Sequence, residues 1–361
     1  MKAVKTIAGT LAIAFMLSGC GSPVSSAAPE SIPVQSVLAS TASEAVDTKD
    51  ATNDLLPRNE IPASYLEPSS QPGQVVRLDY ETNTYDETNR EMNKYAYVYL
   101  PYGYDPQDEQ TRYDILYLMH GWTGDAELYL DGENGTRPLK YILDNLIANG
   151  DMEPMIVVTP TYYQDNQEKG PSVEQEDAGL TANFYHELLA DLMPTVESTY
   201  HTYARSGEDA DLQASRDHRI FGGFSMGAVT TWYTFLHGLD YFKYFMPISG
   251  DCWVISETGM GTDQQTAEET ASYLSQYIQE SGYTPDDFEI YALTGSNDTA
   301  EPALSRQIEA MKKHPESFRY SDTASDGNLH YQITEGGVHS YTSMIRYIYN
   351  VLPVLATKMG Q

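Results

Sequence analysis

Residues 219–228 read Arg-Ile-Phe-Gly-Gly-Phe-Ser-Met-Gly-Ala, and this stretch decides the fold. An apolar run leads into Ser225, which has one glycine two positions before it and another two positions after it. The Gly-x-Ser-x-Gly pattern is typical of a nucleophile elbow, a sharp strand-to-helix turn that exposes a serine hydroxyl. Glycine is favoured at both flanking positions because a side chain there would collide with the adjoining strand or helix. A glycine-rich turn around a buried serine has the same pattern, so the rest of the chain must decide between a nucleophile elbow and such a turn.

Apolar, β-rich segments alternate with amphipathic segments around this stretch. Strands are expected at residues 74–78, 94–100, 113–119, 155–160, 244–248, 288–293 and 330–334, and in the run that enters the elbow. Helices are expected at residues 138–147, 184–200, 267–280 and 341–355, and in the run that leaves it. Strands separated by helices predict an α/β fold with a mostly parallel central sheet and helices on both faces.

Two loops downstream of Ser225 carry the partners that a serine nucleophile needs. A base must take the hydroxyl proton, and a carboxylate must orient that base. Asp298 follows the strand at 288–293, and His339 follows the strand at 330–334. The order serine, acid, histidine, each after a strand, matches the order of α/β-hydrolases. We therefore predict Ser225 as nucleophile, Asp298 as acid and His339 as base, with Asp251, which follows the preceding strand, as the alternative acid.

The oxyanion that forms during acyl transfer needs two backbone N–H donors. One donor is expected from Met226, directly after the nucleophile, and the other from the loop after the first parallel strand. That loop begins His120-Gly121-Trp122, so Trp122 is the predicted second donor. His120 precedes Ser225 in the chain, and a structural role is the better interpretation for it.

Four stretches of the chain together resemble a known family, the esterase-D-type α/β-hydrolases. They are His120-Gly121-Trp122, Gly223-Phe224-Ser225-Met226-Gly227, Gly295-Ser296-Asn297-Asp298 and Gly337-Val338-His339. Within that group the resemblance is greatest to carbohydrate esterase family 1, the feruloyl and acetyl-xylan esterases. It runs from about residue 74 to the end of the chain and departs from the family pattern at Ala228 and Val338. The resemblance implies an α/β-hydrolase fold and a serine esterase that cleaves acyl esters on plant polysaccharides or oligosaccharides through an acyl-enzyme.

The N-terminus predicts secretion and a lipid anchor. Lys2 and Lys5 precede an apolar run at residues 6–17, which is too short for a comfortable membrane span. The run ends in Leu-Ser-Gly-Cys20, which resembles the lipobox of bacterial lipoproteins. We therefore expect a signal peptide at 1–19, lipidation of Cys20 and a lipid-anchored location outside the bacterial cell membrane. A secretory signal with an incidental cysteine is the alternative.

The predicted domain organisation follows from composition. Residues 20–73 begin with Cys20 and are rich in Ser, Ala, Pro and Thr, which predicts a disordered tether. The catalytic domain is expected at residues 74–361. Three stretches, residues 162–179, 206–217 and 253–282, are interpreted as insertions that either form a substrate pocket or remain solvated acidic loops.

Charge and motifs exclude several functions. The formal charge of −31, from 52 acidic against 21 basic residues, argues against a nucleic-acid partner. Metal-binding, phosphate-loop and dinucleotide motifs are missing from the sequence, so no metal and no cofactor are implied.

Several alternatives are left open by the residues. Tyr162, Tyr163, Trp253 and Tyr341 could line a substrate pocket or pack in the core. The same fold also supports another small-ester hydrolase, an acyltransferase or a peptidase. A non-catalytic glycan-binding surface lipoprotein is disfavoured, because such a protein needs no intact Ser225, Asp298 and His339.

Overall fold

The structure is a computed structural model that describes residues 56–164, 174–256 and 262–360. All of these residues belong to one compact unit, Ala45–Gln361. The predicted signal peptide at 1–19 and the predicted lipidation site Cys20 lie outside the described residues. Within the described helices, none combines the length and the apolar composition needed to cross a membrane.

One mostly parallel sheet organises the described residues. Its strands are β1 (Gln74–Asn83), β2 (Glu91–Leu100), β3 (Asp114–Met119), β4 (Met155–Thr159), β5 (Arg219–Phe224), β6 (Tyr244–Ile248), β7 (Glu289–Asn297) and β8 (Leu329–Val338). They lie in the order β1-β2-β4-β3-β5-β6-β7-β8. β2 pairs antiparallel with β1 and β4, and every pairing from β4 to β8 is parallel. β5, which leads into the elbow, therefore lies inside the sheet between β3 and β6.

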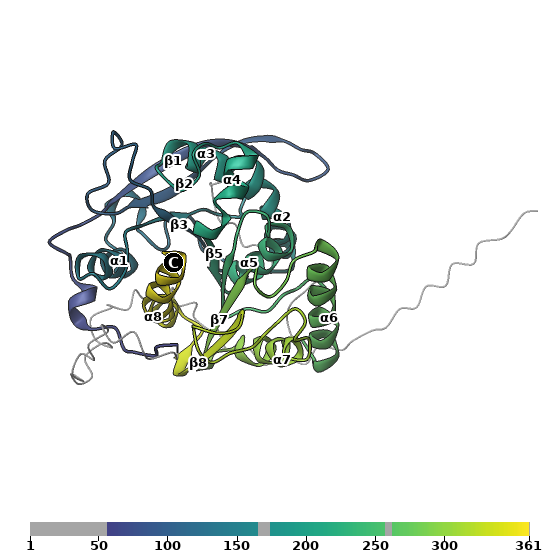
Figure 1. Ribbon diagram of the computed structural model, residues 1–361. Helices are drawn as coiled ribbons and strands as arrows, with labels where there is room; N and C mark the ends of the chain where they lie inside the picture. The colour runs from purple at the N-terminus through teal and green to yellow at the C-terminus, as the bar shows by residue number, and fades with distance from the viewer. Residues whose placement is uncertain (1–55, 165–173, 257–261, 361) are drawn as a thin grey trace, which may run out of the picture. The chain divides into compact units, whose positions relative to one another are not determined.

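Helices cover both faces of this sheet (Figure 1). They are α1 (Pro138–Ala148), α2 (Glu174–Glu187), α3 (Met193–Thr199), α4 (Asp209–Ala214), α5 (Met226–His237), α6 (Gln264–Ser281), α7 (Glu301–Met311) and α8 (Tyr341–Met359). Short 3-10 helices span Ala63–Leu66, Gly132–Asn134 and Arg216–His218, and a π-helical turn at Leu188–Leu192 joins α2 to α3. α1 and α8 lie on one face, whereas α2, α5 and α6 lie on the other (Figure 1).

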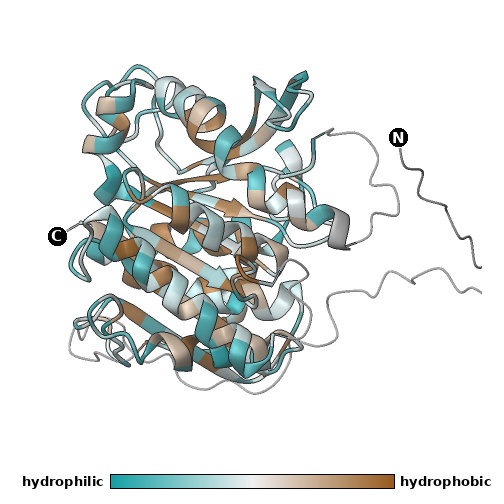
Figure 2. Ribbon diagram, turned by 90° about the vertical axis from the view of Figure 1, so that its right-hand side faces the viewer, coloured by the Kyte–Doolittle hydropathy of each residue, from teal (hydrophilic) through white to brown (hydrophobic). Residues whose placement is uncertain are grey.

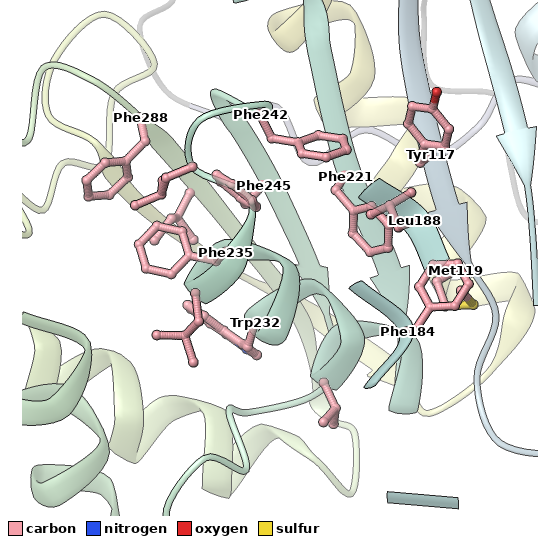
Figure 3. Packing of buried hydrophobic residues seen from close by; sticks show 14 of the residues in the cluster. Tyr117, Met119, Phe184, Leu188, Phe221, Trp232, Phe235, Phe242, Phe245 and Phe288 are labelled. Carbon is pink, nitrogen blue, oxygen red and sulfur yellow. The ribbon is translucent and has the colours of Figure 1, made fainter. Parts of the chain in front are cut away.

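Two hydrophobic cores follow from this layering, one on each face. Alternate residues of β3 divide between them: Tyr117 and Met119 join the core under α2 and α5, and Leu116 and Leu118 join the core under α1 and α8. Phe184, Phe221 and Trp232 pack in the first core, which is rich in aromatic rings (Figure 3). The central strands are hydrophobic, as their brown colour in Figure 2 shows. This is expected for parallel strands, because both of their faces are covered. The predicted α/β fold class is confirmed.

The N-terminal boundary of the folded domain differs from the prediction. Leu56 is buried in the core under α8, and the Gln332 side-chain amide donates hydrogen bonds to the Leu56 and Pro57 carbonyls at 3.2 and 2.6 Å. The Gly73 N–H donates to Asp144 at 2.8 Å. The prediction of a disordered tether is therefore wrong for residues 56–73, which fold onto the domain.

The predicted insertions carry more helix than expected. α2 begins at Glu174, ten residues before the expected helix at 184–200, and α4 lies within residues 206–217. α6 begins at Gln264, where Asp263 caps it by accepting from the Thr266 N–H at 2.8 Å, and ends at Ser281 before the left-handed cap residue Gly282. These segments are therefore parts of the helical layer as well as connections between strands.

Candidate active site

The elbow places Ser225 at the point where β5 ends and α5 begins. Its backbone has φ 58° and ψ −118°, a sparsely populated conformation that costs on the order of 1–3 kcal/mol and is concentrated at functional sites. The Ser225 N–H donates to the Ile248 carbonyl at 2.8 Å, which ties the turn to β6. A Cβ added at Gly223 would lie 2.4 Å from the Gly227 carbonyl oxygen, and one added at Gly227 would lie 2.3 Å from the Met119 oxygen. Only glycine fits both positions.

The structure brings the predicted serine, histidine and aspartate together. His339 Nε2 lies 2.9 Å from Ser225 Oγ, and His339 Nδ1 lies 2.7 Å from Asp298 Oδ1. Asp298 follows β7, and His339 lies between β8 and α8. The Asp298 side chain is fully buried, whereas the His339 side chain is 29% exposed. A base that solvent can reach, held by a buried carboxylate, is the geometry that serine activation requires.

Hydrogen bonding keeps the Asp298 carboxylate charged. Burial alone would raise its pKa, but the hydrogen bonds from His339 and from the Ala300 N–H, the latter at 2.8 Å, lower the pKa below the usual value. An ionised Asp298 can only accept, so His339 Nδ1 carries the proton toward it. His339 Nε2 then presents a lone pair to the Ser225 hydroxyl, as a general base must.

The alternative acid, Asp251, lies elsewhere in the hydrogen-bond network. Its carboxylate accepts from the Thr262 hydroxyl at 2.5 Å and from the Trp253 indole N–H at 3.3 Å. Desolvation by burial raises the pKa of Asp251 in spite of these bonds. The structure therefore favours Asp298 as the partner of His339, as the sequence predicts.

A tight turn at Gly121–Gly124 lies directly against the nucleophile. A Cβ added at Gly121 would lie 3.1 Å from the Ser225 Cβ. The Gly124 N–H closes the turn by donating to the Gly121 carbonyl at 3.0 Å. Trp122 is therefore close to Ser225, while Met226 occupies the first turn of α5, where backbone N–H groups lack partners within the helix. Their roles as oxyanion donors stay a prediction.

His120 supports this turn and is buried, as its structural interpretation predicts. Its Nδ1 lies 2.7 Å from the Gly121 carbonyl oxygen, so that nitrogen carries the proton. Its Nε2, 2.7 Å from Thr161 Oγ1, then accepts from the threonine hydroxyl. His120 thereby links the turn to the segment that follows β4.

Most of the aromatic residues considered as a pocket wall are packing residues. Tyr162 is buried, with its ring centroid 4.6 Å from that of His120, and the rings of Tyr341 and Tyr129 stack at 6.1 Å. Trp253 is 8% exposed, whereas Trp122, which follows Gly121 in the turn that lies against Ser225, is 42% exposed. Trp122 is thus the more accessible of these rings.

Sequence reasoning missed Asp177, which contacts the active-site turn. Its carboxylate accepts from the Trp122 indole N–H at 3.0 Å and from the Tyr163 hydroxyl at 3.1 Å. Asp177 belongs to α2, inside a segment interpreted as an insertion, and no motif marks it. In the described part of the chain, no group of three or more His, Cys, Asp or Glu side chains is placed to hold a metal ion.

The fold and this site define the class of the protein as an α/β-hydrolase. The Esterase family model, described as "Putative esterase", matches residues 86–348, and the chain belongs to that family. The resemblance to esterase-D-type enzymes of carbohydrate esterase family 1 is thereby confirmed.

Two curated relatives share part of their length with this chain. Endo-1,4-beta-xylanase Y of Acetivibrio thermocellus is 39% identical over 293 residues, which cover 81% of this chain and 24% of the relative. Endo-1,4-beta-xylanase/feruloyl esterase of Xylanibacter ruminicola is 29% identical over 248 residues, which cover 66% of this chain and 27% of the relative. The chain thus spans about a quarter of the length of each of these relatives.

Two solved structures share the fold. A mutant of the feruloyl esterase module from Clostridium thermocellum, complexed with sinapinate, is 37% identical with a TM-score of 0.69, over 83% of this chain and 94% of that module. The ferulic acid esterase of the anaerobic fungus Anaeromyces mucronatus has a TM-score of 0.56 over 82% of this chain and 97% of its own. At 18% identity, the fungal enzyme supports the fold alone.

Proposed function

We propose that this protein is a serine esterase that removes feruloyl or related acyl groups from plant polysaccharides or oligosaccharides. The observation that carries the proposal is the continuous hydrogen-bond chain from Ser225 Oγ through His339 to Asp298, with heavy-atom distances of 2.9 and 2.7 Å. A relay of this kind activates a serine for attack on an ester carbonyl.

Acylation follows from these contacts. The Ser225 oxygen attacks the carbonyl carbon while its proton moves to His339 Nε2, and the buried Asp298 carboxylate stabilises the resulting imidazolium through Nδ1–H. The N–H groups of Met226 and Trp122 hold the oxyanion of the tetrahedral intermediate. When the intermediate collapses, the bond to the alcohol breaks, and His339 returns its proton to the departing alcohol oxygen.

Deacylation repeats these steps with water as the nucleophile. His339 removes a proton from the water as its oxygen attacks the acyl-enzyme carbonyl. The bond to Ser225 then breaks, the serine oxygen recovers a proton from His339, and the free acid leaves. This cycle uses no metal and no cofactor.

The feruloyl preference is supported by relatives. A feruloyl esterase module that is 37% identical aligns over 83% of this chain. An acyl group with an aromatic ring also suits a site where Trp122, in the turn that lies against Ser225, is 42% exposed.

Two assays test this function. The purified protein should release acid from 4-nitrophenyl acetate, and Ser225→Ala should abolish the release. Full activity in Ser225→Ala would contradict the mechanism. Hydrolysis of acetylated xylan but not of methyl ferulate would redirect the substrate proposal to acetyl esters, and inactivity on every ester would favour a glycan-binding role.

We further propose that the enzyme is anchored outside the cell membrane through lipidated Cys20. The support is the basic and apolar N-terminus ending in Leu-Ser-Gly-Cys20, since two or more acyl chains give the stable anchoring that a single chain does not. In a bacterial host, the full chain should incorporate labelled palmitate and sediment with membranes, and Cys20→Ala should do neither. Labelling that survives in Cys20→Ala would contradict the anchor.

A further inference from the structure

The turn beside the nucleophile is held in a conformation that its own sequence does not favour. Gly121–Gly124 forms a closed four-residue turn, and Thr123, at its third position, has φ 61°. A positive φ at the third position of such a turn normally calls for glycine or asparagine, and a β-branched residue there is an outlier. Contacts from outside the turn must therefore stabilise it.

Those contacts converge on one buried oxygen. The Trp122 indole N–H donates to Asp177 Oδ2 at 3.0 Å. The Thr123 backbone N–H donates to the Tyr163 hydroxyl at 3.1 Å, and that hydroxyl donates to the same Asp177 oxygen at 3.1 Å. Both central residues of the turn are thus tied to one carboxylate, directly or through Tyr163.

Asp177 is suited to this task by its position. It is 3% exposed and lies in α2, which packs against α5, the helix that follows the nucleophile. Hydrogen bonds to a charged acceptor are about twice as strong as neutral ones. The carboxylate therefore connects the turn on one side of Ser225 to the helical layer that supports the elbow on the other.

We propose that Asp177 is a positioning residue for the oxyanion side of the site, acting through Trp122 and Tyr163. The proposal rests on the proposed esterase function, in which the Trp122 N–H is an oxyanion donor. Because the turn lies against Ser225, its relaxation would move that donor. A displacement of about 1 Å in a catalytic site can cost up to about 10²-fold in rate.

We call the hydrogen bonds that tie Trp122 and, through Tyr163, Thr123 to Asp177 the clamp. Kinetics of three variants test it. Asp177→Ala should lower kcat on 4-nitrophenyl acetate by about tenfold while KM stays within about twofold, because the oxyanion forms only after binding. Asp177→Asn keeps an acceptor oxygen and should restore kcat to within about threefold of the parent. Tyr163→Phe removes one of the two links, so its kcat should fall between those of Asp177→Ala and the parent.

Asp191 offers a matched control. One oxygen of its carboxylate likewise accepts two side-chain hydrogen bonds, here from the hydroxyls of Thr82 and Tyr85, each at 2.7 Å, and neither donor belongs to the turn. Asp191→Ala should lower the thermal midpoint and leave kcat within about twofold. If both alanine variants lowered kcat equally, Asp177 would have only a structural role and the proposal would fail.

A double-mutant cycle tests the route of action. Glycine adopts a positive φ without strain, so Thr123→Gly should make the turn less dependent on the clamp. In that background, Asp177→Ala should cost less than about threefold in kcat, because linked residues are non-additive. An equal loss in both backgrounds would overturn the proposal.

Fluorescence separates failure of the clamp from failure of the esterase function. Of the three tryptophans, Trp232 and Trp253 are 1% and 8% exposed, so acrylamide quenching reports mainly on Trp122, at 42%. Asp177→Ala should raise the quenching constant, and Asp177→Asn should not. Unchanged quenching in Asp177→Ala would overturn the clamp even in a chain without esterase activity.

Discussion

Asp298 and Asp251 follow neighbouring parallel strands, β7 and β6, and are equally hidden from solvent at 4% and 3% exposure. Asp298 accepts hydrogen bonds from an imidazole and a backbone N–H, whereas Asp251 accepts from an indole and a hydroxyl. The pKa of Asp298 is lowered against the effect of burial, but burial dominates at Asp251 and raises the pKa. A strand end thus supplies a position for an acid, and the donors around it decide its role.

The largest expected effect is on catalysis at Asp298. Asp298→Asn should lower kcat by about 10⁴-fold, because a neutral amide no longer selects the His339 tautomer that leaves Nε2 free to accept. Steady-state hydrolysis of 4-nitrophenyl acetate measures the loss, and circular dichroism checks the fold. A greater loss in Asp251→Asn than in Asp298→Asn would exchange the roles of the two carboxylates.

The next effect is on stability at Asp251. Asp251→Ala leaves the Thr262 hydroxyl and the Trp253 indole N–H without their acceptor, and unpaired buried donors cost about 1–3 kcal/mol each. We expect the free energy of unfolding to fall by about 2–4 kcal/mol. Denaturant titration measures this change.

Catalysis in Asp251→Ala is the accompanying check. Because its hydrogen bonds run to Trp253 and Thr262 rather than to His339, kcat should stay within about fivefold of the parent. A loss approaching that of Asp298→Asn would remove the distinction between the two sites.

A smaller effect on stability is expected from substitution of Thr262, whose hydroxyl donates to Asp251 at 2.5 Å. Thr262→Val keeps the side-chain shape but removes that donor, which should cost about 1–2 kcal/mol of stability. Thr262→Ser keeps the hydroxyl and is the control, with a smaller cost. A loss of stability in Ser but not in Val would mean that the methyl group, and not the hydrogen bond, carries the contribution.

Sequence reasoning found the parts of this site that are encoded locally. The elbow is a compact motif, and Asp298 and His339 each follow a strand in a fixed order along the chain, so pattern and topology locate them. Asp177 acts through contacts with Trp122 and Tyr163, at sequence separations of 55 and 14 residues, and neither pair has a periodicity that predicts it. Such a contact becomes visible only once α2 is placed beside the turn.

The folded segment before β1 escaped prediction for a related reason. Residues 56–73 are polar and rich in proline, so their composition favours disorder. Their attachment comes from a buried Leu56 and from side-chain amides that donate to backbone carbonyls, such as Gln332 and Asn350. Backbone acceptors are present in every sequence, and composition therefore carries no sign of them.

The smallest expected effect is a pair of opposite pH trends in stability. The pKa of Asp298 is lower in the folded chain, so its contribution is present above its unfolded value of about 4 and is lost as pH falls through the folded pKa. The pKa of Asp251 is raised, so its contribution is present below about pH 4 and is lost as pH rises through the folded pKa. Relative to Asp298→Asn the parent should therefore gain stability as pH rises, and relative to Asp251→Asn it should lose stability. Unfolding midpoints of the three proteins between about pH 3 and 8 measure both trends. Two slopes of the same sign would contradict the difference in environment between the two carboxylates.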